Sequence, residues 1–243
     1  MRVGVYIDAY NLYYGARGHC GRSTPGWRWL DVRQLAETLL SPRQDWADAQ
    51  ASRVVYCTAR VDARSNASAQ RDQDIYLKAL IAHGSVDYIE YGAYVARTKK
   101  ALLANADSKG RPVPVTSQWP VMVRDAQGND VRQAQFVVQV MNMEEKGSDV
   151  NVATHLLIDV MRGDVDAALV ISNDSDLRLP IQEARRVVPV AVVNPGKGPL
   201  AGALSGERSE GVGQHWWQQL TSSDIYASQL PEQVAKYARP DGW

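Results

Sequence analysis

The stretch DAALVISNDSDL, residues Asp166–Leu177, decides the fold that the sequence predicts. Its apolar run, Ala167–Ile171, is typical of a strand buried on both faces, as the central strands of parallel sheets are. The run passes directly into SNDSD, residues 172–176, so two carboxylates follow the end of the strand. Ligands of open α/β sheets bind at the carboxyl ends of the strands. We therefore expect the rest of the chain to bring more polar side chains to this edge.

The other predicted elements alternate between strands and helices. Short apolar runs predict strands at Val3–Ile7, Arg53–Thr58, Val86–Tyr94 and Val187–Val193, where Pro189 places the last strand near a sheet edge. Helical patterns begin at Asp31, at about Ser68, at Ser148 or Asp149, and at about Leu177. This order predicts an α/β fold with a mostly parallel, doubly wound sheet. The strands Val3–Ile7 and Ala167–Ile171 are expected to be central neighbours.

Two additions to this core are expected. Trp119–Arg124 and Val131–Met141 flank DAQGND, residues 125–130, which predicts a β-hairpin inserted at about 115–142. Residues 194–213 are rich in Gly, Pro and Ser and are expected to be mobile, and Trp216 and Trp217 are expected in a short helix. The sequence thus predicts one core domain, 1–193, with the extension 194–243 packed on it.

Composition limits the kind of protein. The 243 residues contain 27 Lys+Arg and 27 Asp+Glu, so a polyanionic partner must be held by a local basic patch or by metal ions. Cys20 and Cys57 form no CxxC pattern, and two buried thiols fit better than a disulfide or a zinc site. The first apolar run ends at Asp8, too short for a signal peptide or a membrane span. A cytoplasmic protein without a membrane partner is therefore expected.

Four carboxylates are expected at one edge of the sheet. Asp8 ends the first strand, Asn11 follows on a tight turn, and Asp149 lies in the first turn of a helix. Each acid alone is explained by helix capping, but Asp8, Asp149, Asp174 and Asp176 together are not. Two like charges 4 Å apart repel by about 1 kcal/mol in water and about 4 kcal/mol at an effective dielectric constant of 20. Protonation or a bound cation must compensate, and oxygen ligands favour Mg²⁺ or Mn²⁺.

Further polar residues are expected to assist such an ion. Asn11, Ser172 and Asn173 are expected to orient water or ligands around it, and Lys146 to supply positive charge to a scissile phosphate. A local positive stretch contains Arg97, Lys99, Lys100, Lys109 and Arg111. It is either a solvated loop or a loop that contacts phosphate.

Three segments resemble the motifs of a known family. YIDAYNLYYG (Tyr6–Gly15), EEKGSDVNVATHLLIDV (Glu144–Val160) and VISNDSDL (Val170–Leu177) are similar to the motifs of NYN-domain proteins, the LabA-like branch of the PIN-like nucleases. WLD, YCTAR and QDIYLKAL, which begin at 29, 56 and 73, are similar to one bacterial NYN subgroup. The resemblance spans about residues 1–193, and the order and spacing of the motifs make it specific.

The resemblance implies a metal-dependent ribonuclease on a PIN-like, Rossmannoid three-layer sandwich. It implies that the acidic ligands are Asp8, Asp149, Asp174 and Asp176, with Asn11 as the asparagine of the first motif. The chain departs from the pattern at Ala9 and Asn173, where many relatives have Gly. Asn tolerates a left-handed backbone, so Ala9 is the larger departure.

Three functions are weighed. The first is a ribonuclease dependent on Mg²⁺ or Mn²⁺, expected to be endonucleolytic, with RNA as substrate. The second is a non-catalytic RNA-binding or regulatory module, in which the basic stretch binds phosphates and Tyr13, Tyr14, Trp216 or Trp217 stacks on bases. The third treats Asp174-Ser175-Asp176 as a glycosyltransferase-type DxD motif, which leaves Asp8 and Asp149 unexplained. A homodimer is left open.

Overall fold

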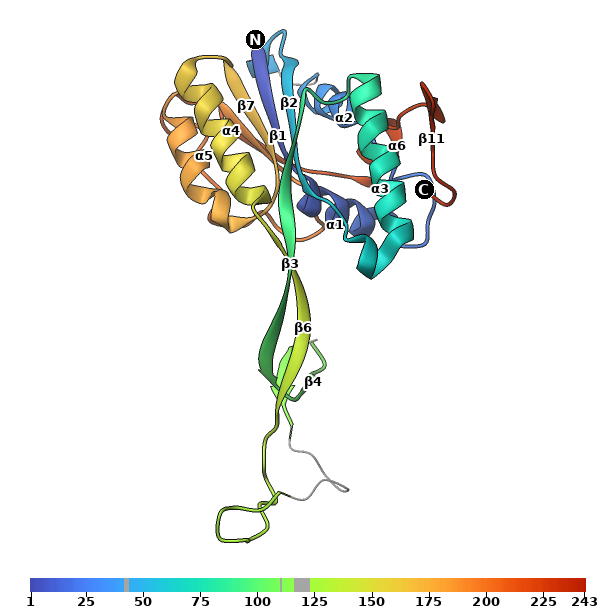
Figure 1. Cartoon of the computed structure of the whole chain (residues 1–243). Helices are drawn as coiled ribbons and strands as arrows, with labels where there is room; N and C mark the ends of the chain where they lie inside the picture. The colour runs from blue at the N-terminus through green and yellow to red at the C-terminus, as the bar shows by residue number, and fades with distance from the viewer. Residues whose placement is uncertain (42–43, 110, 116–122) are drawn as a thin grey trace. The chain divides into compact units, whose positions relative to one another are not determined.

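A computed structural model of the chain describes residues 1–41, 44–109, 111–115 and 123–243 (Figure 1). The chain forms two compact units. The first consists of Met1–Tyr94 and Glu145–Trp243, and the second of Val95–Glu144. The second unit is thus inserted into the sequence of the first. No helix in the described ranges is long and apolar enough to cross a membrane.

A parallel sheet forms the centre of the first unit. Its six parallel strands lie in the order β3-β2-β1-β7-β8-β9. Their bounds are β1 Arg2–Asp8, β2 Gln50–Ala59, β3 Tyr88–Leu102, β7 Ala167–Ile171, β8 Val190–Asn194 and β9 Trp216–Gln219. A seventh strand, β6 (Val137–Lys146), pairs with the other side of β3. In register, Val3 of β1 lies beside Ala167 of β7 and Ile7 beside Ile171, which confirms the predicted central pair.

Helices cover both faces of the sheet. One face carries α1 (Ala9–Cys20), α2 (Val32–Leu40) and α3 (Ala63–His83), and the other carries α4 (Ser148–Arg162) and α5 (Arg178–Arg185) (Figure 1). Side chains of α1, α2 and α3 pack with Val5 and Ile7 of β1, whereas those of α4 and α5 pack with Tyr6 and Val170. The result is a three-layer α/β sandwich, as the element order predicted.

Shorter elements complete the description. They are the 3-10 turns η1 (Gln44–Trp46) and η2 (Ser175–Leu177), helix α6 (Ser222–Ala227), and the small strands β4 (Ala104–Ala106), β5 (Pro112–Pro114), β10 (Gln233–Val234) and β11 (Tyr237–Ala238).

Local sequence explains where the main elements start and stop. Every residue of β7 is buried, as its unbroken apolar run predicted. The Asp31 carboxylate caps α2 by accepting hydrogen bonds from the main-chain N–H groups of Arg33 and Gln34. Gly147 precedes α4 and Gly163 follows it, with φ of 101° and 71°, conformations that disfavour residues with a Cβ.

Two elements after β7 differ from the prediction. Strand β8 is interior, because β9 pairs with its outer side, and Pro189 lies just before its first residue. Trp216 and Trp217 belong to β9 and not to a helix. Successive side chains of a strand point to opposite faces of the sheet, which explains the different environments of the two rings. The Trp216 ring packs 5.4 Å from the Trp46 ring, whereas Trp217 is 55% exposed.

The inserted unit is longer than predicted and contains more strand. It runs over Val95–Glu144 instead of about 115–142. The basic stretch was expected to be a loop, but β3 continues through Leu102, and β4 pairs antiparallel with β5. Arg124 and Asp130 form a bridge around the expected turn, whereas most of the expected strand Trp119–Arg124 lies outside the described residues. Most described residues of this unit are exposed, so no buried apolar period marked its strands.

Gly15 allows α1 to pack closely on the segment that follows β8. A Cβ at Gly15 would lie 2.3 Å from the main-chain oxygen of Pro195, whereas one at Gly18 in the same helix meets nothing within 4 Å. We expect Gly15→Ala to destabilise the protein by about 1–3 kcal/mol through overpacking. Gly18→Ala is the matched control and should stabilise it by about 0.5–1 kcal/mol. Urea unfolding measures both, and equal effects would contradict the packing explanation.

Candidate active site

Among the four predicted acids, Asp8 is the one that the fold buries. It is the last residue of β1 and the N-cap of α1, and only 2% of it is exposed. The main-chain N–H of Asn11 donates to Asp8 Oδ1 over 3.0 Å, and the Asn11 side-chain amide donates to Oδ2 over 2.9 Å. The predicted tight turn between Asp8 and Asn11 is therefore one hydrogen-bonded unit.

Ser172 connects this turn to the end of β7. Its buried hydroxyl donates to Asp8 Oδ2 over 3.1 Å and accepts from the main-chain N–H of Asp174 over 3.1 Å. The main-chain N–H of Asn173 donates to the side-chain oxygen of Asn11 over 3.3 Å. The structure thus brings together Asp8, Asn11, Ser172 and Asp174 from two segments that are far apart in sequence, as predicted for neighbouring strands.

Burial makes the negative charge of Asp8 costly. Loss of solvent around the carboxylate raises its pKa, the hydrogen bonds from Asn11 and Ser172 lower it, and the charge of Asp174 raises it further. The net pKa shift is upward from the ordinary value of 3.8. A cation beside Asp8 and Asp174 would offset both the burial and the repulsion.

The remaining predicted acids lie around this pair. Asp176 is exposed in η2, where its main-chain N–H donates to Asp174 Oδ1 over 2.9 Å. Asp149 is half-buried in the first turn of α4. Because α4 leads into the start of β7, its own start lies at the carboxyl edge of the sheet. Lys146 is exposed at the end of β6, before Gly147.

The four acids do not form one tight metal-binding cluster. Across the ranges that the structure describes, no three His, Cys, Asp or Glu side chains are grouped so that they could hold a metal ion. Mg²⁺ is commonly held by only one or two protein carboxylates and keeps several waters. The hard oxygen donors Asp8 and Asp174, which Ser172 connects, fit such an ion.

One expected ligand-orienting side chain, that of Asn173, binds main-chain groups instead, and the expected phosphate-binding residues belong to the inserted unit. The Asn173 side chain does not face Asp8, because its amide donates to the Pro199 carbonyl over 3.1 Å and its oxygen accepts from the Ala201 N–H over 2.7 Å. It fastens the Gly/Pro-rich segment instead. Lys99 and Lys100 are exposed on β3 in the inserted unit, and Arg97 belongs to the same strand. A phosphate-binding role for these three stays a prediction.

The raised pKa of Asp8 predicts a pH-dependent stability. A carboxyl group whose pKa is raised in the folded state stabilises the fold at low pH, and this contribution is lost as pH rises through that pKa. Asp8→Asn cannot ionise, so the Tm of the variant minus that of the unchanged protein should increase as pH rises above the ordinary carboxyl pKa of about 3.9. Thermal unfolding in EDTA measures this difference. A pH-independent difference would show that Asp8 has no raised pKa.

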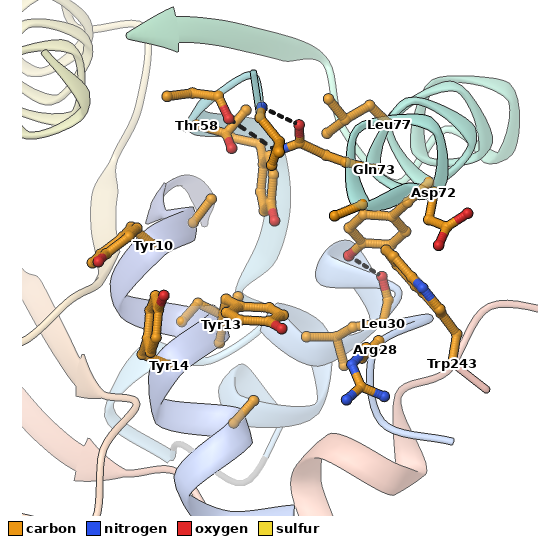
Figure 2. A pocket seen from close by; sticks show the side chains of 18 of the residues that line it. Tyr10, Tyr13, Tyr14, Arg28, Leu30, Thr58, Asp72, Gln73, Leu77 and Trp243 are labelled. Carbon is orange, nitrogen blue, oxygen red and sulfur yellow. Dashed lines mark hydrogen bonds between the residues drawn. The ribbon is translucent and has the colours of Figure 1, made fainter. Parts of the chain in front are cut away.

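A pocket of about 420 Å³ lies beside this acidic edge (Figure 2). Ala9 and Tyr10, which directly follow Asp8, are part of its lining, as are Thr58 and Ala59 at the end of β2. The charge of Asp8 also helps to raise the pKa of Tyr56 in the lining, although burial of the phenol is the larger cause.

Sequence reasoning noted some aromatic residues of this pocket but missed the pocket itself. Tyr13 and Tyr14, which the sequence suggested as base-stacking residues, line it together with Tyr10 of the same helix, whereas the other rings come from separate parts of the chain. These are Trp27, Tyr56, Tyr76, Tyr94 and Trp243. No local pattern joins these segments, because only the fold brings them together.

Comparison with known proteins gives two similarities. No family model matches the chain. The 6-hydroxy-3-succinoylpyridine 3-monooxygenase HspA of Pseudomonas putida is 26% identical over 264 aligned positions, which cover 100% of this chain and 75% of that protein. A solved structure of a protein of unknown function from Vibrio parahaemolyticus matches with a TM-score of 0.45 and 14% identity, over 94% of this chain and 96% of that one. These similarities do not assign the chain to a family.

Proposed function

We propose that the protein is a divalent-metal-dependent ribonuclease whose reaction takes place at the Asp8–Asp174 edge. The hydrogen-bonded unit of Asp8, Asn11, Ser172 and Asp174 carries the proposal. It holds a desolvated carboxylate in one orientation, at the edge of a parallel sheet where ligands bind. The resemblance of the three motifs to NYN-domain proteins supports the same chemistry.

Mg²⁺ or Mn²⁺ would be held by Asp8 and Asp174. Such an ion activates water and neutralises charge that develops on a phosphodiester. Asn11 and Ser172 keep Asp8 oriented, so that little reorganisation is needed when substrate binds. Lys146 would place positive charge near the phosphate, and Asp149 and Asp176 would bind outer waters. The expected cytoplasmic location and the homodimer stay predictions.

Cleavage of labelled single-stranded and structured RNAs tests the proposal. We expect the purified protein to cut RNA with Mn²⁺ or Mg²⁺ and to lose this activity in EDTA. If RNA binds without being cut under any divalent metal, the protein is instead the non-catalytic RNA-binding module. If it neither binds nor cuts RNA, both RNA functions are wrong.

A second candidate is hydroxylation of a small heteroaromatic compound. The similarity to 75% of the Pseudomonas protein, which is named a monooxygenase, and the aromatic pocket beside Asp8 favour it. Such a reaction places one oxygen atom of O₂ on a ring carbon and reduces the other to water, with two electrons from an external reductant such as reduced nicotinamide. Incubation with 6-hydroxy-3-succinoylpyridine, O₂ and NADH, followed by mass spectrometry, tests it. An unchanged substrate mass would exclude this compound as a substrate.

A further inference from the structure

The pocket beside Asp8 has the size and lining of a site for a flat ring. Its volume, about 420 Å³, lies within the range of about 300–1,000 Å³ that is typical of small-molecule sites. Tyr10, Tyr13 and Tyr14 project from α1 on one side, and Asp72, Gln73 and Leu77 come from α3 on the other (Figure 2). Most of the large side chains in the lining are aromatic.

Part of this lining is fixed by hydrogen bonds. The Tyr76 hydroxyl donates to the Leu30 carbonyl over 2.7 Å, and the Gln73 side chain bonds the main chain at both Ala59 and Val61, over 2.9 Å each. Tyr56 and Tyr76 are buried, and burial raises the pKa of both phenols, so both stay neutral at physiological pH. Tyr56, Gln73 and Tyr76 therefore form a fixed, uncharged part of the lining.

The side of the pocket formed by α1 is an exposed aromatic cluster. Tyr10, Tyr13 and Tyr14 are 44%, 41% and 47% exposed, although they contact one another. The Tyr10 and Tyr14 rings lie 4.5 Å apart, and the Tyr13 ring lies 5.4 Å from that of Trp27. Exposed aromatic rings gathered at a pocket are typical of binding sites, since their faces gain stabilisation when a flat ligand excludes water.

Few polar side chains in the lining are placed to give the pocket specificity for a ligand. Thr58 is buried at the end of β2, and its hydroxyl is one of the polar groups of the lining. The Asp72 carboxylate lies at the long distance of 3.7 Å from the guanidinium of Arg71. The Arg28 guanidinium stacks 4.5 Å from the Trp27 ring and donates to the Gly242 carbonyl over 3.0 Å. Thr58 and Asp72 thus offer hydrogen-bonding groups to the edge of a ring.

We propose that this pocket binds a planar nitrogen heterocycle, with a nucleobase as the favoured occupant. The aromatic faces suit any flat ring, and the Asp72 carboxylate suits a ring-edge N–H donor. Because the lining begins at the residue after Asp8, a group attached to the ring would extend toward the acidic edge. The inference concerns binding alone and holds whether or not the protein cleaves RNA.

Isothermal titration calorimetry in EDTA with AMP, UMP, 2-hydroxypyridine and ribose 5-phosphate tests the proposal without metal or turnover. We expect the nucleotides to bind with Kd below about 1 mM and ribose 5-phosphate, which lacks a ring base, not to bind. Binding of the nucleotides alone assigns the site to nucleotides or RNA, and binding of 2-hydroxypyridine alone assigns it to free heterocycles. If no ring compound binds, or ribose 5-phosphate binds as tightly as AMP, the proposal is wrong.

Two variants locate the binding. Tyr13→Leu keeps apolar volume but removes a ring, and we expect it to weaken the binding of the ring ligand about 5- to 150-fold. Tyr226→Leu is the matched control, because Tyr226 is 42% exposed and does not line the pocket. Tyr14→Leu serves as a second variant if Tyr13→Leu fails to fold, as judged by circular dichroism. Equal affinities in the pocket and control variants would place the ligand elsewhere and overturn the assignment.

Discussion

Replacing Asp8 with asparagine is expected to lower the rate of RNA cleavage at saturating Mn²⁺ at least about 100-fold, because a metal-stabilised transition state loses several kcal/mol. The amide carries no charge, and it cannot accept all the hydrogen bonds that Asn11 and Ser172 donate to the carboxylate. The fold should persist, since the variant no longer buries a charge. Single-turnover cleavage of a labelled RNA measures the effect.

Two further variants make this result specific. Asp174→Asn should also lose cleavage, because it removes the second carboxylate of the pair. Asp166→Asn is the matched control, since Asp166 precedes β7 at the opposite edge of the sheet and pairs with Arg2 at 2.8 Å. It should cut RNA at the unchanged rate. Full cleavage by both Asp8→Asn and Asp174→Asn would show that the acidic edge is not the reaction site.

The largest expected loss of stability comes from Trp29→Ala. The Trp29 side chain is fully buried, its indole N–H donates to the Pro231 carbonyl over 2.7 Å, and its ring packs 5.8 Å from that of Tyr76. The cavity and the lost burial together should destabilise the protein by about 3–5 kcal/mol. Unfolding in urea, followed by circular dichroism, measures this.

A second tryptophan provides the comparison. Trp217 has the same side chain but is 55% exposed on β9, so Trp217→Ala should change the stability by no more than about 0.5 kcal/mol. Trp29→Ala should also loosen the C-terminal segment, because it removes the indole N–H that donates to the Pro231 carbonyl and the ring that packs against Trp243. If the two variants lose similar stability, Trp29 does not hold that segment on the domain.

The sequence was most informative where a residue's environment is set locally. The apolar run of β7 and the start of α2 at Asp31 each depend on one strand or one turn, and the structure confirms both. The pairing of β1 with β7 followed from the order of elements, since parallel strands joined by helices have few alternatives. Asp8 and Asp174 were placed together by this argument.

Features that depend on distant contacts were not predictable. Asn173 was expected beside an ion, but its side chain binds main-chain groups of the 199–201 segment, whose path no local pattern indicates. The strand β9 holds Trp216 and Trp217 because β8 offers a free edge, whereas the sequence alone also suits a short helix. The pocket was missed for the same reason, because its lining comes from segments that meet only in the fold.

The place of the insertion in the sequence has a consequence for synthesis on the ribosome. Strand β1 emerges before both of its neighbours and can pair with β2 early. Its other neighbour, β7, follows the whole insertion, as the bond between Arg2 and Asp166, 164 positions apart, illustrates. Until β7 leaves the exit tunnel, the main-chain groups on one side of β1 are unpaired. Such groups favour association with other chains. Loop-closure entropy grows only slowly with length, so a longer insertion would cost the finished protein little. It would mainly lengthen the time for which the nascent chain stays vulnerable.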